Sequence, residues 1–153
     1  MNINCTDFII CPMKLEDLNE VYDINIKSLK SPWSLGSLND EFSNTLSYYV
    51  VCKNSSKKVV GFGGMWLVCG EGNITNIAVH PNFRHMGIGS KIVTELCNIC
   101  TKNNCSDLTL EVRISNTPAI KLYEKIGFQN EGIRKNFYSN PIEDAIIMWK
   151  HNL

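Results

Sequence analysis

Apolar residues along this chain follow two different spacings, and their order predicts a fold. Residues 15–29 and 87–103 repeat their apolar side chains at helical spacing, which predicts two amphipathic helices. Shorter apolar runs, bounded by turn residues, have the length and composition of β-strands. These runs cover residues 8–11, 46–52, 59–68, 72–79, 107–112, 128–133 and 145–149. Strands and helices are therefore mixed along the chain.

Residues that begin and end helices divide the rest of the sequence. Ser34, which follows the break at Pro32, is a typical N-cap and predicts a second, short helix. Thr117 and Pro118 predict the cap and first residue of a fourth helix, which Gly127 ends. The predicted fold is α+β, a seven-stranded mixed, mostly antiparallel sheet with about four helices on its faces. We expect one domain that spans residues 1–153.

The stretch from Asn76 to Ser90, N-I-A-V-H-P-N-F-R-H-M-G-I-G-S, predicts an anion site. A strand enters a turn, and R-x-x-G-x-G then opens a helix. Unpaired N–H groups at a helix start, without a Cβ at Gly87 and Gly89, favour a phosphate or pyrophosphate. An ordinary tight turn gives the same pattern. The dinucleotide motif lacks its third glycine, since Ile92 stands there, and a P-loop has another residue order.

Charge and composition exclude some classes of protein. Fifteen basic and fifteen acidic residues leave no net charge, which argues against nonspecific binding of nucleic acid. No apolar run approaches the roughly 20 residues that cross a bilayer. The first seven residues lack the basic region and long apolar stretch of a signal peptide. We therefore expect a cytoplasmic protein with no direct contact to membranes.

Seven cysteines invite a disulfide or zinc interpretation. Their number is odd and their spacing irregular. Cys97, Cys100 and Cys105 form C-x2-C-x4-C, but the first two fall inside a predicted helix and no second ligand pair follows. Buried free thiols and no metal site are the prediction.

Three further segments occur in a distinctive order. L-E-V-R-I-S-N-T-P-A-I-K-L-Y-E-K-I-G-F runs from Leu110 to Phe128, R-K-N-F-Y from Arg134 to Tyr138, and E-D-A-I-I-M from Glu143 to Met148. Together with the glycine turn and the early S-P-W-S, they resemble the GNAT acetyltransferases over nearly the whole chain. Within that family the resemblance is to the bacterial ribosomal-protein-alanine N-acetyltransferases of the RimI type. It implies the GNAT fold and acetyl-CoA as cosubstrate.

The resemblance also implies which residues bind acetyl-CoA. The pantetheine arm pairs with the backbone of the strand before the turn, and the pyrophosphate lies on main-chain N–H groups of the turn. Asn116 either bonds the pantetheine or caps its helix. The implied contact residues are Ile77, Ala78, Val79, Arg84, His85, Met86, Gly87, Ile88, Gly89, Ser90 and Asn116.

Two residues are candidates for proton transfer. Glu111 is an acidic residue in an apolar strand; the pattern leaves an exposed strand glutamate open, whereas the resemblance implies a general base. Tyr123 is either a core tyrosine or, by resemblance, the general acid that protonates the departing CoA thiolate. A main-chain N–H near Val79 is expected to hold the oxyanion. The expected reaction is direct transfer without a metal.

The resemblance implies that two aromatic residues, Trp33 and Tyr138, frame the acceptor; the alternative for each is an aromatic side chain that only packs on the surface. The resemblance implies the N-terminal alanine of a small-subunit ribosomal protein as substrate. An α-amine, with a pKa of about 8, needs a weaker base than a lysine, at about 10.4. The alternatives are a lysine, polyamine or small-molecule acceptor, and a non-catalytic CoA-binding module.

Overall fold

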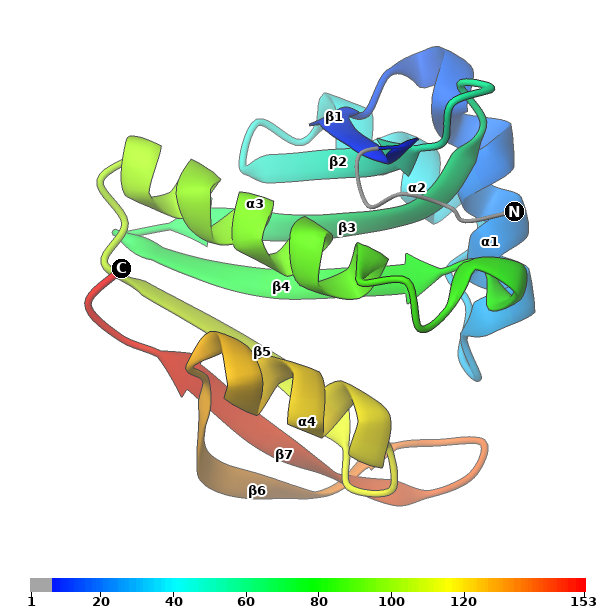
Figure 1. Ribbon diagram of the computed structural model, residues 1–153. Helices are drawn as coiled ribbons and strands as arrows, with labels where there is room; N and C mark the ends of the chain where they lie inside the picture. Colours follow the sequence, from blue (N-terminus) through cyan, green and yellow to red (C-terminus); the bar gives the residue numbers. More distant parts are fainter. Residues whose placement is uncertain (1–6) are drawn as a thin grey trace.

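The computed structural model describes residues 7–153, and in this range the chain forms one seven-stranded sheet (Figure 1). The strand order is β1-β2-β3-β4-β5-β7-β6, and all neighbours are antiparallel except β4 and β5. The strands are β1 (Ile9–Pro12), β2 (Ser47–Lys53), β3 (Val59–Val68), β4 (Glu71–Val79), β5 (Asp107–Arg113), β6 (Gln129–Tyr138) and β7 (Glu143–Lys150). The α-helices are α1 (Leu18–Ser28), α2 (Leu35–Asp40), α3 (Ile88–Lys102) and α4 (Thr117–Ile126). Short 3-10 turns cover Leu15–Asp17, Glu41–Ser43 and Pro81–Phe83.

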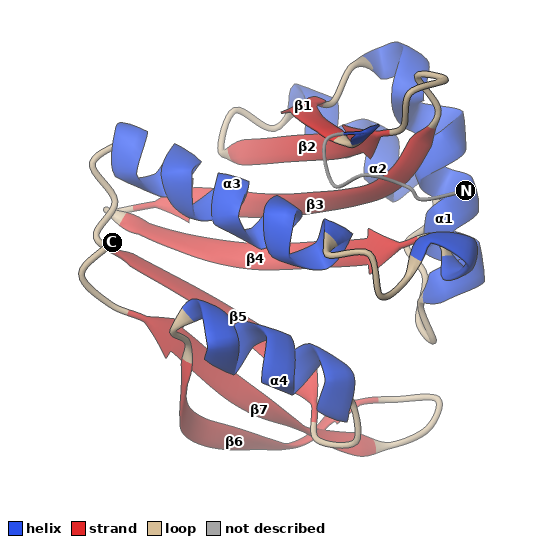
Figure 2. Ribbon diagram, viewed as in Figure 1, coloured by secondary structure: helices blue, strands red, loops and turns tan. Residues whose placement is uncertain are grey.

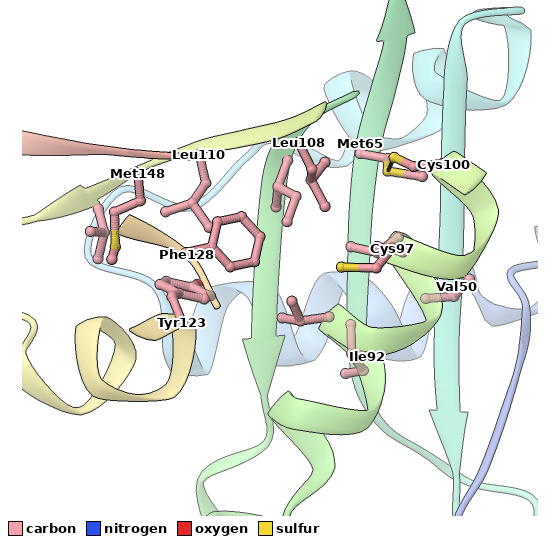
Figure 3. Packing of buried hydrophobic residues seen from close by; sticks show 14 of the residues in the cluster. Val50, Met65, Ile92, Cys97, Cys100, Leu108, Leu110, Tyr123, Phe128 and Met148 are labelled. Atoms are coloured by element: carbon pink, nitrogen blue, oxygen red, sulfur yellow. Dashed lines mark hydrogen bonds between the residues drawn. The ribbon is translucent and has the colours of Figure 1, made fainter. Parts of the chain in front are cut away.

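The two faces of the sheet carry different helices (Figure 2). α3 and α4 pack on one face over the larger core, whereas α1 and α2 pack on the other over Val51 and Phe62. On α3 the apolar stripe expected from the sequence comprises Ile88, Ile92, Leu96 and Ile99; the first three are fully buried, and Ile99 is half-buried. Figure 3 shows this core from close by, with Tyr123 beside Phe128. The predicted fold is confirmed.

The ends of several elements differ from the prediction. β6 runs on to Tyr138 and β7 starts at Glu143, so both strands are longer than expected. β6 lies at the sheet edge, where most of its residues are exposed, and so no apolar alternation marks its second half. Ser34 caps α2 and Gly127 ends α4, as predicted. The predicted cap at Thr117 is wrong: Asn116 caps α4, because its Oδ1 accepts from the Ala119 N–H at 3.3 Å.

β4 and β5 separate after a short stretch of pairing. Their pairs run only from Glu71 with Asp107 to Ile74 with Leu110, although β4 extends to Val79. At the same place the β3–β4 register shifts, and Thr75 becomes the extra residue of a β-bulge. Residues 75–79 of β4 therefore have no partner strand on the β5 side, and we call them the open edge of β4.

The cysteine prediction is confirmed only in part. All six cysteines in the described range are free: Cys52, Cys97, Cys100 and Cys105 are buried, Cys11 is half-buried, and Cys69 is exposed in the β3–β4 turn. Cys5 lies outside the described residues. Across residues 7–153, no group of three His, Cys, Asp or Glu side chains is arranged to hold a metal ion. In the same range no helix is long and apolar enough to cross a bilayer.

The end of the chain is tied to the sheet by a histidine. His151 Nδ1 lies 2.6 Å from Asp107 Oδ1, and its Nε2 lies 2.8 Å from Glu131 Oε2. Its ring stacks on Trp149. Hydrogen bonds to Asp107 and then to Glu131 raise the pKa of His151 above its ordinary value. The protonated imidazole therefore links β5, β6 and the segment after β7.

We expect Gly64→Ala to destabilise the protein, because a Cβ at Gly64 would lie 2.2 Å from Cζ of Tyr49. Overpacking of this kind costs about 1–3 kcal/mol. Gly36→Ala is the matched control, since its Cβ would meet only Ser34 Oγ, at 3.9 Å, and alanine favours a helix by up to about 1 kcal/mol. Urea unfolding of both variants measures this. Equal stability of the two would contradict the packing of Tyr49 on Gly64.

The stabilisation from His151 should depend on pH. Because its pKa is higher in the folded than in the unfolded chain, its contribution is fully present below the unfolded value of about 6.5. It is lost as the pH rises through the folded value. The deficit of His151→Gln in unfolding free energy should thus be larger at pH 6 than at pH 9. Asn98→Gln, on the exposed side of α3, is a control without a titrating group and should show no such change between these two conditions.

Candidate active site

Along the open edge of β4, the backbone groups have a partner strand, β3, on one side only. The His80 N–H donates to the Val60 carbonyl of β3 at 2.8 Å. Because backbone groups alternate along a strand, those of Ala78 also point to β3, and those of Ile77 and Val79 point away from it. The Ser28 hydroxyl donates to the Val79 carbonyl at 3.1 Å. The groups of Ile77 and the Val79 N–H are thus placed to pair with an extended ligand.

The glycine turn connects this edge to α3. Gly87 has a left-handed φ of +78° and is the N-cap of α3. The first backbone bond inside the helix runs from Lys91 N–H to the Gly87 carbonyl, so the N–H groups of Ile88, Gly89 and Ser90 precede it. A Cβ built on Gly87 meets no atom within 4 Å, so the turn is open at the residue that precedes these donors. This geometry fits a pyrophosphate.

The other predicted residues of the turn differ in exposure. Arg84 and His85 are exposed, and Met86 is half-buried against the larger core. His85 has a left-handed φ of +63°. The left-handed backbone at His85 thus bends the turn, and the side chains of Arg84 and His85 extend into solvent.

Glu111 lies on the sheet face opposite α3 and α4. Its neighbours Leu110 and Val112 are buried under those helices, and alternation directs Glu111 the other way. There it lines a hollow of about 370 Å³ together with Trp66, Thr109, Arg134 and Trp149. The side chain is 18% exposed, and Arg134 Nη2 lies 3.7 Å from its Oε1. Glu111 is therefore a largely covered carboxylate on a concave surface, unlike a freely exposed strand glutamate.

Tyr123 lies on the other face, on α4, and packs edge-to-face on Phe128 at 5.8 Å (Figure 3). Burial is the main cause that raises its pKa well above the ordinary value, and negative charge at Tyr138 adds to this. The phenol thus keeps its proton at neutral pH. Both interpretations of the sequence are compatible with this position, since Tyr123 is a core tyrosine and also a neutral proton donor.

Tyr138 is the half-buried last residue of β6. Burial is the largest cause that raises its pKa to about 12, and the Glu111 carboxylate raises it further against the opposing effect of Arg113. The charge of Glu111 therefore acts on Tyr138, and that of Tyr138 acts on Tyr123. The structure thus gathers three predicted site residues around the end of β5.

Trp33 is half-buried in the loop between α1 and α2. The side chain of Asn25 holds its backbone twice, donating to the Trp33 carbonyl at 2.7 Å and accepting from its N–H at 3.0 Å. Asn25 is fully buried and was not predicted as a site residue. A polar residue beside Ile24 on an otherwise apolar helix face was the available signal. The same loop meets the β6–β7 turn, where Ser31 Oγ donates to the Ser139 carbonyl at 3.5 Å.

Asn116 stands at the start of α4, close in sequence to the end of β5. Its Oδ1 accepts from the Ala119 N–H, so the capping role is observed. Its side-chain N–H₂ makes no hydrogen bond to residues 7–153, which leaves donors for a ligand.

An open strand edge that leads to an anion site at a helix start is the geometry of an acyl-CoA-dependent N-acyltransferase. Residues 18–128 match the model of the acetyltransferase (GNAT) family. The chain belongs to the GNAT family and is an acyltransferase.

Similarity to individual proteins is more specific than the family match. The chain is 40% identical over 138 residues to a Bacillus subtilis protein whose name assigns it provisionally as a ribosomal protein bS18-alanine N-acetyltransferase, and it covers 91% of that protein. It is 33% identical to the Escherichia coli ribosomal protein bS18-alanine N-acetyltransferase, with 91% of this chain and 94% of the relative covered. The crystal structure of the ribosomal-protein-S18-alanine N-acetyltransferase from Escherichia coli superimposes with a TM-score of 0.87 at 31% identity, covering 95% of this chain and 94% of the other.

Gly87→Ala should weaken the binding of CoA. The added Cβ would lie in the opening of the turn, at the residue that precedes the α3 donors, and loss of one hydrogen bond to a charged group corresponds to about tenfold in affinity. Gly70→Ala is a matched control, because Gly70 also has a left-handed φ, of +82°, and an open Cβ position. Calorimetric titration with CoA should separate the two variants. Equal affinities would place the pyrophosphate elsewhere.

Proposed function

We propose that this chain is an acetyl-CoA-dependent Nα-acetyltransferase, one domain over residues 1–153, that acetylates the N-terminal alanine of ribosomal protein bS18 in the cytoplasm. The similarity to ribosomal protein bS18-alanine N-acetyltransferases over about nine-tenths of the chain carries the proposal. The positions of Glu111 and Tyr123 on the two faces of β5 support it.

The proposed binding of acetyl-CoA uses the backbone more than side chains. Main-chain N–H groups from Gly87 to Ser90 hold the pyrophosphate at the positive end of α3. The pantetheine arm extends along Ile77 to Val79 as an additional strand, and Asn116 donates to it from the start of α4. Acetyl-CoA supplies an acetyl group activated as a thioester.

Proton transfer is assigned to residues on opposite faces of the sheet. Glu111, through a water in its hollow, accepts the proton of the attacking amine as the N–C bond forms. Tyr123 gives its proton to the thiolate as the C–S bond breaks, and it is suited to this because burial keeps the phenol protonated. The Val79 N–H stabilises the oxyanion. The amine thus enters from one face, and CoA leaves on the other.

The acceptor peptide is assigned to the space between the α1–α2 loop and the β6–β7 turn. Trp33 forms one wall and Tyr138 the other, and the hydrogen bond from Ser31 to Ser139 holds these walls together. An α-amine has a pKa of about 8, so a carboxylate is a sufficient base for it. A lysine acceptor would need a stronger base.

The test is release of CoA with two peptides, followed by mass mapping of the acetyl group. One peptide begins with a free alanine, and the other has a blocked N-terminus and an internal lysine. We expect turnover on the free alanine, reduced at least roughly 100-fold in Glu111→Gln and in Tyr123→Phe. Acetyl-CoA should bind to both variants with unchanged affinity.

Two controls match these variants in chemistry. Glu124→Gln changes an exposed glutamate on α4, and Tyr48→Phe removes a hydroxyl on β2 that bonds only Asn103. Both should keep full activity. Turnover mainly on the lysine peptide would contradict the substrate, and binding of acetyl-CoA without turnover on either peptide would indicate another acceptor or a non-catalytic module.

A further inference from the structure

Arg113, the last residue of β5, is a buried charge that the reaction described above does not use. It is 8% exposed and lies on the same sheet face as Glu111. A buried guanidinium is costly unless all its donors are paired. Its partners therefore indicate why the fold keeps a charge at this position.

The guanidinium bonds four acceptors. Nη1 donates to the Pro141 carbonyl and to Glu143 Oε1, each at 3.1 Å. Nη2 donates to Ser31 Oγ at 3.3 Å and to the Ser139 carbonyl at 3.4 Å. Its carbon also lies 4.3 Å from the centre of the Tyr138 ring, within cation–π distance.

These partners belong to the two segments that frame the proposed acceptor site. Ser31 is in the α1–α2 loop, residues 29–34, which carries Trp33. Ser139 and Pro141 are in the β6–β7 turn, residues 139–142, which follows Tyr138. In the described chain, the hydrogen bonds between loop and turn run through Ser31 directly or through Arg113. Arg113 is thus the common partner of both segments.

Glu143 fixes Arg113 independently of the loop. Its Oε1 accepts from Arg113, and its Oε2 accepts from the Ser115 N–H at 2.8 Å. Hydrogen bonding from Ser115, first through its side chain and then through its backbone, lowers the pKa of Glu143, and this keeps the carboxylate charged. The ion pair with Glu143 therefore fixes the guanidinium at the end of β5. The α1–α2 loop and the β6–β7 turn form hydrogen bonds to this fixed group.

We propose that Arg113 is the positioning residue of the acceptor site: it sets the spacing between the Trp33 loop and the Tyr138 turn and so determines which peptide ends fit. The inference rests on the proposed function, and it assigns Arg113 no contact with acetyl-CoA or with the reacting atoms. A lysine cannot replace it, because an ammonium lacks the planar fork that reaches four acceptors at once.

Steady-state kinetics with the alanine peptide test this role. Arg113→Gln and Ser31→Ala should each raise KM for the peptide roughly tenfold or more, with kcat and the KM for acetyl-CoA changed less than about threefold. Arg113→Lys should not restore the peptide KM. Ser31→Ala removes one exposed hydroxyl, so it remains informative if Arg113→Gln does not fold. Ser56→Ala, in the β2–β3 turn, is the matched control and should behave as wild type.

Hydrogen–deuterium exchange supplies a readout that needs no substrate. Arg113→Gln and Ser31→Ala should speed exchange in residues 29–34 and 139–142 and leave α3 unchanged. An unchanged peptide KM, or a fall in kcat without a change in KM, would overturn the inference. If the wild-type protein does not turn over the alanine peptide, the proposed function fails, and unchanged exchange in both segments would then also overturn the role of Arg113.

Discussion

The separation of β4 from β5 after four residue pairs is the constraint on which the site depends. A continuous sheet would use the backbone groups of Ile77 and Val79 for pairing with β5. Because the strands part at the bulge around Thr75, both groups of Ile77 and the Val79 N–H have no partner strand, whereas Ser28 bonds the Val79 carbonyl. Beside the bulge, Tyr49, Thr75 and Asn76 each have a buried polar atom without a hydrogen bond of good geometry in the described chain. Such groups concentrate at functional sites.

The separation of β4 from β5 would destabilise the structure if each segment around it were held only by contacts within that segment. Hydrophobic packing stabilises the two faces of the sheet unequally, because α1 and α2 belong to a smaller core than α3 and α4. Buried polar groups make up for this. Asn25 holds the Trp33 backbone, Ser28 bonds the end of β4, and Arg113 joins β5 to both acceptor segments. Each of these bonds spans elements that are not adjacent in the sheet.

The parts of the structure that were predictable from sequence are those that depend on residues close together in the chain. The glycine turn and the caps at Ser34 and Gly127 depend on residues within a few positions, and the structure has them as predicted. The face of Glu111 depends on the register of β5 in the sheet, so the pattern alone left it open. Arg113 meets partners 26 to 82 positions away, and no local pattern reports such contacts. The long exposed half of β6 was missed for the same reason.

The protonation and position of two buried thiols, Cys52 and Cys100, support the proposed direct transfer. Burial raises the pKa of Cys52 to about 11 and of Cys100 to about 12, so neither thiol provides the thiolate that an acetyl-cysteine intermediate needs. Both belong to the core under α3, and Glu111 faces the other side of the sheet. In the proposed reaction one proton leaves the amine and another joins the thiolate, and the Glu111 carboxylate on β5 and the neutral Tyr123 phenol on α4 are assigned to these two steps.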